Sequence, residues 1–329
     1  MTVPLDPDAR FVGIDQAYAR HAHQAPAERR WLLVQTIVSA LPRRTLIGSL
    51  PIRPGARVLD LGCGFGAASL EIAALSGCTV VGLDTDLPVL TLARAIADEV
   101  GSASGVGGLG GGGAGGGWGG AGGAGGGWGG AGGAGGGGLG GGGGGGGSAV
   151  SFAVGDAYRL PFPDRSFDMV FARFVFQHLR QAEQAASEVT RVLVPGGLAC
   201  IVDVDDGLSI SEPPPSLAFE RLAKALQASQ TSYGGDRRIG RRLPAILDRA
   251  GLVPNPVLVL PQAAYHRPEP GDPERLLMLE RLGAARPGIV GGGHMTAEEF
   301  EADLAAFAAE APGPTCEIEA HLAVLATRP

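Results

Sequence analysis

Short unbroken apolar runs alternate along this chain with longer stretches in which apolar residues recur every three or four positions. The short runs predict strands buried on both faces, and the longer spacing predicts helices that pack through one face. Strands that alternate with helices are joined by right-handed crossovers and form a parallel sheet. We expect strands at Arg57–Leu61, Thr79–Asp84, Val150–Gly155, Phe167–Ala172 and Leu198–Val204, separated by helices at Ala67–Leu75, Pro88–Val100 and Arg180–Val192.

Both ends of the chain carry further helical patterns. Residues 15–50 are spaced as helices, and two later apolar runs, Val257–Leu260 and Leu322–Ala326, are expected to finish the sheet. We therefore expect a helical segment over residues 1–54 that covers the site, a core over 55–207, and a lid with the final strands over 208–329. The helices expected in this last part are Leu217–Gln230, Arg241–Ala250, Pro273–Leu282 and Thr296–Glu310.

A glycine-rich stretch, Gly101–Ser148, interrupts the core between the second helix and the third strand. It holds 34 of the 57 glycines and no charged residue, and a ten-residue unit occurs twice in it. Glycine loses the most entropy on ordering, and the stretch has few side chains to bury, so we predict a disordered insertion. The alternative is a glycine-rich interaction arm that binds through Trp118 and Trp128.

Composition narrows the function further. The chain has 329 residues and a net charge of −7, and an acidic protein is a poor match for nucleic acid. The four cysteines have no metal-ligand spacing, so we expect no metal site and reduced thiols in a cytoplasmic protein. The first ten residues lack a secretory pattern, and no apolar run reaches the roughly twenty residues of a membrane span.

The segment Val58–Gly66 carries the main chemical signal. An apolar strand leads into a turn with Gly62, Gly64 and Gly66, and a helical pattern follows at once. Alternate glycines let backbone approach a ligand closely, and the helix N-terminus offers free N–H groups. Asp84 ends the next strand, about twenty residues on, where a carboxylate can accept ribose hydroxyls. The pattern predicts a nucleoside-containing cofactor.

Spacing indicates which cofactor. Dinucleotide sites read G-x-G-x-x-G, whereas this loop reads G-x-G-x-G and Asp60 lies two residues before it, where it favours an ammonium over a pyrophosphate. The loop resembles the first motif of class I S-adenosylmethionine-dependent methyltransferases, D/E-x-G-x-G-x-G. The resemblance extends from about Val58 to Asp205, and includes Leu160-Pro161-Phe162 and the Pro195-Gly196-Gly197 turn.

The resemblance implies an α/β fold: a Rossmann-like, doubly wound sheet of seven mostly parallel strands, with N-terminal helices and a helical lid. It implies S-adenosylmethionine as cofactor. Asp60, Gly62, Cys63, Gly64 and Gly66 match the wall around its methionine portion. Asp84 matches the ribose ligand, Thr85 packs on adenine, Asp156 and Ala157 contact the adenine edge, and Arg173 lies beside the sulfonium. For Asp156 a plain turn residue, and for Arg173 a structural salt bridge, remain alternatives.

Other side chains are candidates for different tasks. We expect Asp86 to cap the next helix and Asp168 to shape the entry to its strand. His178 is the candidate general base, although a packing or cofactor contact is favoured over catalysis. Tyr18, Gln177 and His178 are the candidate substrate contacts, and His21 and His23 are weaker ones. The basic cluster Arg237, Arg238, Arg241 and Arg242 suits a solvated helix start or, alternatively, an anionic substrate.

The leading hypothesis is therefore a methyltransferase that acts on an oxygen, nitrogen or carbon atom of a small molecule, similar to ubiquinone and menaquinone biosynthesis enzymes. Two alternatives stay open. One is an NAD(P)-dependent oxidoreductase, and the other is a glycine-rich interaction protein with a vestigial methyltransferase core. The sequence does not indicate the oligomeric state.

Overall fold

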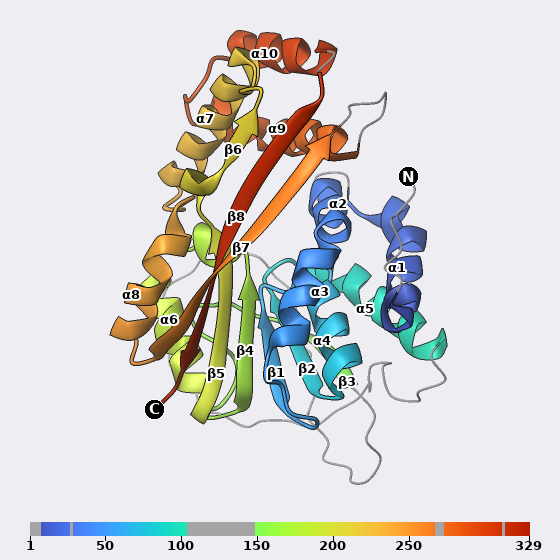
Figure 1. Ribbon diagram of the computed structural model, residues 1–329, viewed down its shortest axis with the longest axis vertical. Helices are drawn as coiled ribbons and strands as arrows, with labels where there is room; N and C mark the ends of the chain where they lie inside the picture. The colour runs from blue at the N-terminus through green and yellow to red at the C-terminus, as the bar shows by residue number, and fades with distance from the viewer. Residues whose placement is uncertain (1–7, 27–28, 104–148, 267–272, 311–312) are drawn as a thin grey trace, which may run out of the picture.

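The computed structural model describes residues 8–26, 29–103, 149–266, 273–310 and 313–329. The glycine-rich insertion was predicted to begin at Gly101, but residues 101–103 are the last turn of a described helix, so its start is corrected to residue 104. The rest of the insertion, with Trp118 and Trp128, lies outside the described ranges. A single sheet of eight strands runs in the order β3-β2-β1-β4-β5-β8-β6, and β7 pairs with β8 (Figure 1). The strands are β1 Arg57–Leu61, β2 Thr79–Asp84, β3 Ala149–Val154, β4 Phe167–Arg173, β5 Leu193–Val204, β6 Ile210–Glu212, β7 Val253–His266 and β8 Thr315–Thr327.

The first five strands are parallel, and β8 is antiparallel to β5, β6 and β7. The predicted α/β fold class, with its mostly parallel Rossmann-like sheet, is confirmed. The predicted count of seven strands is wrong by one, because the short strand β6 is also present. β8 continues beyond its pairing with β5, and β6 supplies backbone partners for that extension through Ile210↔Ile318 and Glu212↔Cys316.

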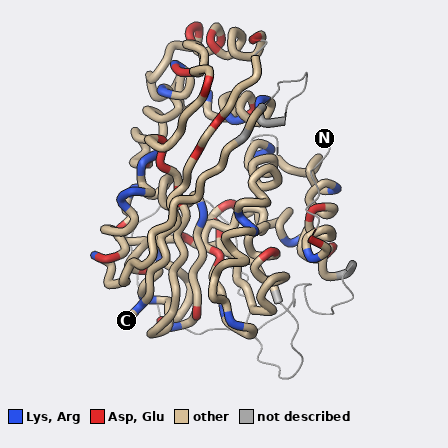
Figure 2. The backbone as a smooth tube through the Cα atoms, viewed as in Figure 1, with Lys and Arg blue, Asp and Glu red and all other residues tan. Residues whose placement is uncertain are grey.

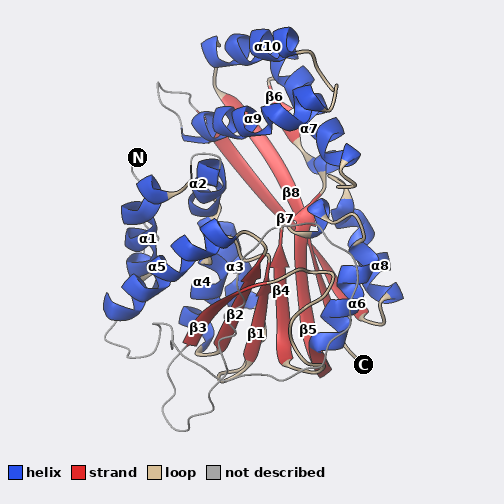
Figure 3. Ribbon diagram, turned by 180° about the vertical axis from the view of Figure 1, so that it is seen from behind, coloured by secondary structure: helices blue, strands red, loops and turns tan. Residues whose placement is uncertain are grey.

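Helices cover both faces of the sheet (Figures 1 and 3). Helices α1, α3, α4 and α5 pack over one face, and α6 and α8 pack over the other. The segment 15–50, predicted as helical, contains several helices and begins earlier, since Asp8 caps α1 through the N–H of Arg10. The helices are α1 Ala9–His21, α2 Arg30–Val38, α3 Ala40–Ser49, α4 Ala67–Ser76, α5 Leu87–Ala103, α6 Ala182–Val192, α7 Leu217–Ser232, α8 Leu243–Arg249, α9 Pro273–Gly291 and α10 Ala297–Ala309, with short 3-10 turns η1 Ala22–Gln24, η3 Phe176–His178, η4 Asp206–Leu208 and η5 Ile239–Arg242.

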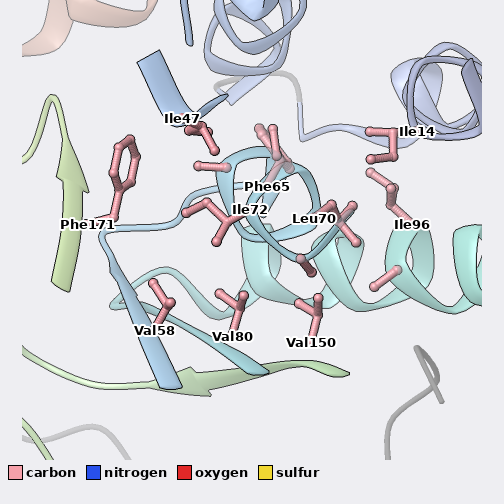
Figure 4. Packing of buried hydrophobic residues seen from close by; sticks show 14 of the residues in the cluster. Ile14, Ile47, Val58, Phe65, Leu70, Ile72, Val80, Ile96, Val150 and Phe171 are labelled. Carbon is pink, nitrogen blue, oxygen red and sulfur yellow. The ribbon is translucent and has the colours of Figure 1, made fainter. Parts of the chain in front are cut away.

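Successive side chains of each strand point to opposite faces of the sheet, and apolar residues occupy both sets of positions. Val58, Val80 and Val150, on β1, β2 and β3, lie in a row beneath α4, where they meet Leu70 and Ile72 (Figure 4). The alternate strand residues, such as Leu59 and Val81, belong to the cluster under α6 and α8 instead. Each such side chain contributes about 1.5–3 kcal/mol by leaving water, so the register of the sheet is strongly fixed.

The lid has a small apolar core of its own. Leu222 of α7, Leu282 and Ile289 of α9 and Phe300 of α10 are buried together. Strands β7 and β8 extend from the main sheet up to these helices, so the lid stands at the carboxyl ends of the parallel strands (Figure 1). Thr296 and Glu299 form a capping box that starts α10. These helices therefore lie beside the carboxyl ends of the parallel strands, where a cofactor is expected.

Acidic and basic residues are interspersed along the described backbone (Figure 2). Among the helices of the described ranges, none combines the length and the apolar character needed to cross a bilayer.

Candidate cofactor and acceptor site

The glycine loop connects β1 to α4 in a tight, left-handed course. Gly62, Gly64 and Gly66 have φ values of +67°, +53° and +80°, which only glycine adopts readily. The Gly62 N–H donates to the carbonyl of Leu83 at 2.7 Å and ties the loop to β2. A Cβ on Gly64 would meet only Leu32 Cδ2 at 3.9 Å, so its α-carbon faces open space in the cavity. The loop thus leaves room for a ligand directly above Gly64.

Two residues of the predicted site lie behind the loop instead of facing the cavity. Gly66 packs against the ring of Phe152. A Cβ at position 66 would lie 2.5 Å from Phe152 Cζ, so only glycine allows this close contact. Tyr18 is buried at 3% exposure, and its hydroxyl donates to the carbonyl of Phe65 at 2.7 Å. The prediction that Tyr18 contacts substrate is therefore corrected: this side chain braces the back of the loop.

Asp84 lies at the carboxyl end of β2 beside the loop. One carboxylate oxygen accepts from the Gly64 N–H at 2.9 Å, and the other accepts from the Asp86 N–H at 3.0 Å. Thr85 follows, exposed where it lines the cavity. Asp86 accepts from the Val89 N–H at 3.2 Å and caps α5, in agreement with the sequence, and it also pairs with Arg29. Asp84 is thus held in one orientation with its remaining lone pairs available.

Asp60 lies on the same side of the loop but deeper. It is 2% exposed and accepts from the Ser69 hydroxyl at 2.6 Å. Burial raises the pKa of Asp60 to about 7, against the opposing effects of Ser69 and Arg43. A cationic group arriving from the cavity would favour the carboxylate form. Cys63, its neighbour on the cavity wall, has a pKa raised by burial and stays a neutral thiol.

The third strand contributes the far side of this pocket. Asp156 is exposed at the cavity wall, and one of its oxygens accepts from the Tyr158 N–H at 2.9 Å. Ala157 is buried beside it and also lines the cavity. Asp168 lies elsewhere, accepting from the Arg57 N–H at 2.8 Å at the start of β1, as the strand-entry interpretation predicts.

A single large cavity runs from the glycine loop to the lid. Its volume is about 1740 Å³, larger than the roughly 300–1,000 Å³ typical of a site for one small ligand. One end holds Asp60, Gly62, Asp84 and Asp156, and the other is enclosed by β7, β8 and α9. The cavity therefore has room for a cofactor and a second molecule together.

Arg173 lies at the end of β4, between these two ends. Its guanidinium group stands 3.9 Å from the ring centroid of Phe174. It forms no ion pair with any residue in the described ranges, and this opposes the alternative of a structural salt bridge. Burial, and next the charge of Arg43, lower the pKa of Arg173 to about 9. Phe174 has a φ of +62°, a strained conformation for a residue with a side chain, and lines the cavity. No local sequence pattern predicts this strain.

The His178 side chain lines the cavity, just after β4. Its Nδ1 lies 3.3 Å from the amide nitrogen of Gln230, which also donates to the carbonyl of Gln177. An amide that donates to Nδ1 leaves the proton of a neutral imidazole on Nε2. Desolvation, then the charges of Arg237 and Arg281, lower the pKa of His178 to about 4. In this state His178 is a hydrogen-bond donor and a weak base.

Gln177 is 4% exposed and is fixed from several sides. Its N–H donates to Asp203 at 3.1 Å, and its side-chain oxygen accepts from Arg237 at 2.8 Å. His321 of β8, which sequence reasoning missed, lines the same region, with its ring centroid 4.8 Å from that of Phe174. Only the tertiary pairing of β8 with β5 brings His321 to the cavity.

The basic cluster separates into distinct contacts. Arg237 reaches the cavity, but its guanidinium pairs with Asp206 at 2.7 Å. Arg241 pairs with Asp205 and Arg242 with Asp236, both outside the cavity lining. The weaker candidates His21 and His23 also lie outside the cavity lining, and His21 contacts Glu99 at 2.8 Å.

Comparisons with known proteins identify relatives of this chain. A family model described as a methyltransferase domain matches residues 142–201. Sterol 24-C-methyltransferase ERG6B of Gibberella zeae is 27% identical over 184 residues, 56% of this chain and 31% of that protein. Demethylmenaquinone methyltransferase of Deinococcus radiodurans is 38% identical over 68 residues, 21% of this chain and 25% of that protein.

A third relative, 27-O-demethylrifamycin SV methyltransferase of Amycolatopsis mediterranei, is 24% identical over 192 residues, 58% of this chain and 53% of that protein. The matched part thus spans about a third of the length of the sterol enzyme and about half of the length of the rifamycin enzyme.

Proposed function

We propose that this chain is a class I S-adenosylmethionine-dependent methyltransferase, which transfers a methyl group from S-adenosylmethionine to an oxygen, nitrogen or carbon atom of a small molecule. The observation that carries the proposal is the placement of Asp60, the glycine loop and Asp84 along one edge of a cavity large enough for two ligands. The observed fold brings these groups together from β1 and β2.

The residues present fit the cofactor. The open side of Gly64 leaves space that a Cβ would fill, and the fixed carboxylate of Asp84 suits two ribose hydroxyls. Asp60 is proposed to receive the ammonium group, and Asp156 and Ala157 are proposed to receive the adenine edge. Arg173 is proposed as a neighbour of the methionine end. When bound, the cofactor supplies an electrophilic methyl group on sulfur.

The protein's own contribution is alignment and exclusion of water. Phe174 and His321 enclose the space beside Arg173, and Gln177 is held by Asp203 and Arg237. His178 is proposed to orient the acceptor through its Nε2–H, because its lowered pKa and its contact with Gln230 oppose a role as general base.

The acceptor is proposed to be a small, partly apolar molecule. The relatives described above are named for sterols, demethylmenaquinone and a rifamycin, and the cavity here includes Leu258, Leu260 and Met278. An NAD(P)-dependent oxidoreductase is not favoured, because the family model and these relatives are methyltransferases. A vestigial core is not favoured either, because Asp60, Gly64 and Asp84 line the same cavity. The four cysteines are free, which supports a reducing, cytoplasmic location.

The test measures cofactor choice first and methyl transfer second. By isothermal titration calorimetry we expect S-adenosylmethionine and S-adenosylhomocysteine to bind in the micromolar range and NAD⁺ and NADP⁺ not to bind. Tritiated methyl donor incubated with the protein and a small-molecule extract should then give a labelled organic product. Selective binding of NAD⁺ would instead support the oxidoreductase alternative, and binding without transfer to any extract would support a vestigial core.

A further inference from the structure

A charged side chain at the lid end of the cavity lacks a counter-charge. Arg281 of α9 lines the cavity, and its guanidinium carbon stands 5.8 Å from the ring centroid of Trp31 on α2. Within the described ranges it makes no ion pair and no hydrogen bond. Burial, and next the charge of Arg237, lower the pKa of Arg281 to about 10, so the group is still cationic at neutral pH.

Arg281 is partly buried, and a guanidinium group that is partly withdrawn from water is more stable when an anion lies beside it. The neighbouring charges do not supply the pair. Arg237 is already paired with Asp206 and carries the same sign as Arg281. Glu319 of β8 acts on Arg281 only at longer range, without an ion pair. The cavity thus presents a cation with five donors and no fixed acceptor.

The surroundings of Arg281 combine this charge with an apolar surface. Leu277 and Met278 lie on the same helix, and Leu258 and Leu260 of β7 line the cavity as well. His178, whose charge environment includes Arg281, offers an Nε2–H in the neutral state described above. A ligand suited to this end has an apolar body and an anionic oxygen group, which an arginine binds better than any other side chain.

We propose that the methyl acceptor carries a carboxylate or a phosphate monoester, and that Arg281 binds this group while the apolar body lies along Leu258 and Leu260. The inference rests on the proposed function and names its substrate class. The sequence had raised an anionic substrate as a partner for the basic cluster. The structure favours Arg281 of α9 as the binding cation instead, because Arg241 and Arg242 are paired outside the cavity.

The experiment measures binding of three ten-carbon probes by calorimetry, with S-adenosylhomocysteine present at saturation. The probes are decanoate, decyl phosphate and decanol. We expect at least one of the two anions to bind at least tenfold more tightly than decanol, and the tighter one identifies the anionic group. Arg281→Met keeps an apolar stem and removes the charge, so it should weaken that anion at least tenfold and change decanol less than threefold.

Two further variants make the test specific. Arg286, on the same helix, pairs with Glu301 outside the cavity lining, so Arg286→Met should leave anion binding within twofold. Glu319→Gln removes the competing negative charge and should strengthen anion binding.

Equal binding of all three probes, no binding of either anion, or unchanged anion binding in Arg281→Met would overturn the inference. A loss of equal size in Arg286→Met would overturn it too. Failure of S-adenosylhomocysteine itself to bind contradicts the proposed function separately, and the same probes then test Arg281 on the free chain.

Discussion

At the scale of single residues, Asp84 connects the glycine loop to the proposed ribose site. Its two oxygens accept from the Gly64 and Asp86 N–H groups, which fixes the carboxylate at the cavity edge. We predict that Asp84→Ala weakens binding of S-adenosylhomocysteine at least tenfold, measured by calorimetry. Asp168→Ala is the matched control, because Asp168 bonds to Arg57 away from the cavity and should leave the affinity within twofold. Unchanged affinity in Asp84→Ala would remove the ribose assignment.

Asp60 gives a prediction about pH. Burial raises its pKa to about 7 in the free protein, so below pH 7 the group is mostly protonated and loses its attraction for an ammonium. The proton must leave before the ligand's cationic end binds, so affinity for S-adenosylhomocysteine should fall more than tenfold from pH 7 to pH 5. His178 and His321 have pKa values near 4 and do not titrate over most of this window.

The matched variant for this prediction is Asp60→Asn, which keeps the shape of the side chain and removes its charge. It should bind more weakly at pH 7 and lose most of the pH dependence. A dependence of the same steepness in the variant would show that another group is responsible.

Local spacing in the sequence was enough to predict which of these residues lie together at the cavity. The glycines, Asp60 and Asp84 lie in one β-α-β unit, where motif and geometry go together. Tyr18 was misplaced because spacing along a helix does not tell which neighbour its hydroxyl will meet. Arg281 and His321 were missed for a related reason, since each reaches the cavity only through the packing of the lid and of β8.

At the scale of elements, a buried ion network joins the N-terminal helices to the core. Glu71 of α4 is fully buried and accepts from Arg43 at 2.6 Å and from Arg44 at 2.7 Å, both on α3. Arg44 also pairs with Asp15 of α1. The network holds α1 and α3 against the helix that follows the glycine loop, and Tyr18 of α1 completes the contact with the loop.

We predict that Glu71→Gln lowers the free energy of unfolding by about 3–5 kcal/mol, because it leaves two buried guanidinium groups without their shared carboxylate. Glu183→Gln removes a pair with Arg249 in which both side chains are 57% exposed, and should cost less than about 1 kcal/mol. Urea unfolding followed by circular dichroism measures both. Equal losses in the two variants would contradict the role given to the network.

Strand extents were harder to predict than strand positions. The expected strand Val257–Leu260 is the centre of β7, which runs from Val253 to His266. Prolines at positions 254, 256 and 261 argue against a central strand, but β7 pairs only with β8 and proline is tolerated in such an edge strand. The sequence alone did not reveal which strand would form the edge.

At the scale of the whole molecule, the insertion provides a further prediction. Helix α5 ends at Ala103 and β3 begins at Ala149, so the glycine-rich stretch connects two elements of the core. The predicted disorder of residues 104–148 concerns residues outside the described ranges and stays a prediction. Replacing residues 104–148 by a short Gly/Ser linker should leave the melting temperature and S-adenosylhomocysteine affinity nearly unchanged, because loop closure depends weakly on length. Melting many degrees lower would show that the stretch is ordered against the core.

One edge of the cavity is proposed to hold S-adenosylmethionine, and a crystal structure with S-adenosylhomocysteine tests this placement. We predict one ligand per chain, with both ribose hydroxyls within hydrogen-bond distance of Asp84. Its amino-acid end should lie against Gly62 and Gly64, with the ammonium directed to Asp60, and its adenine beside Asp156. A ligand bound elsewhere or in the reverse orientation, or no bound ligand at saturating concentration, would contradict the account.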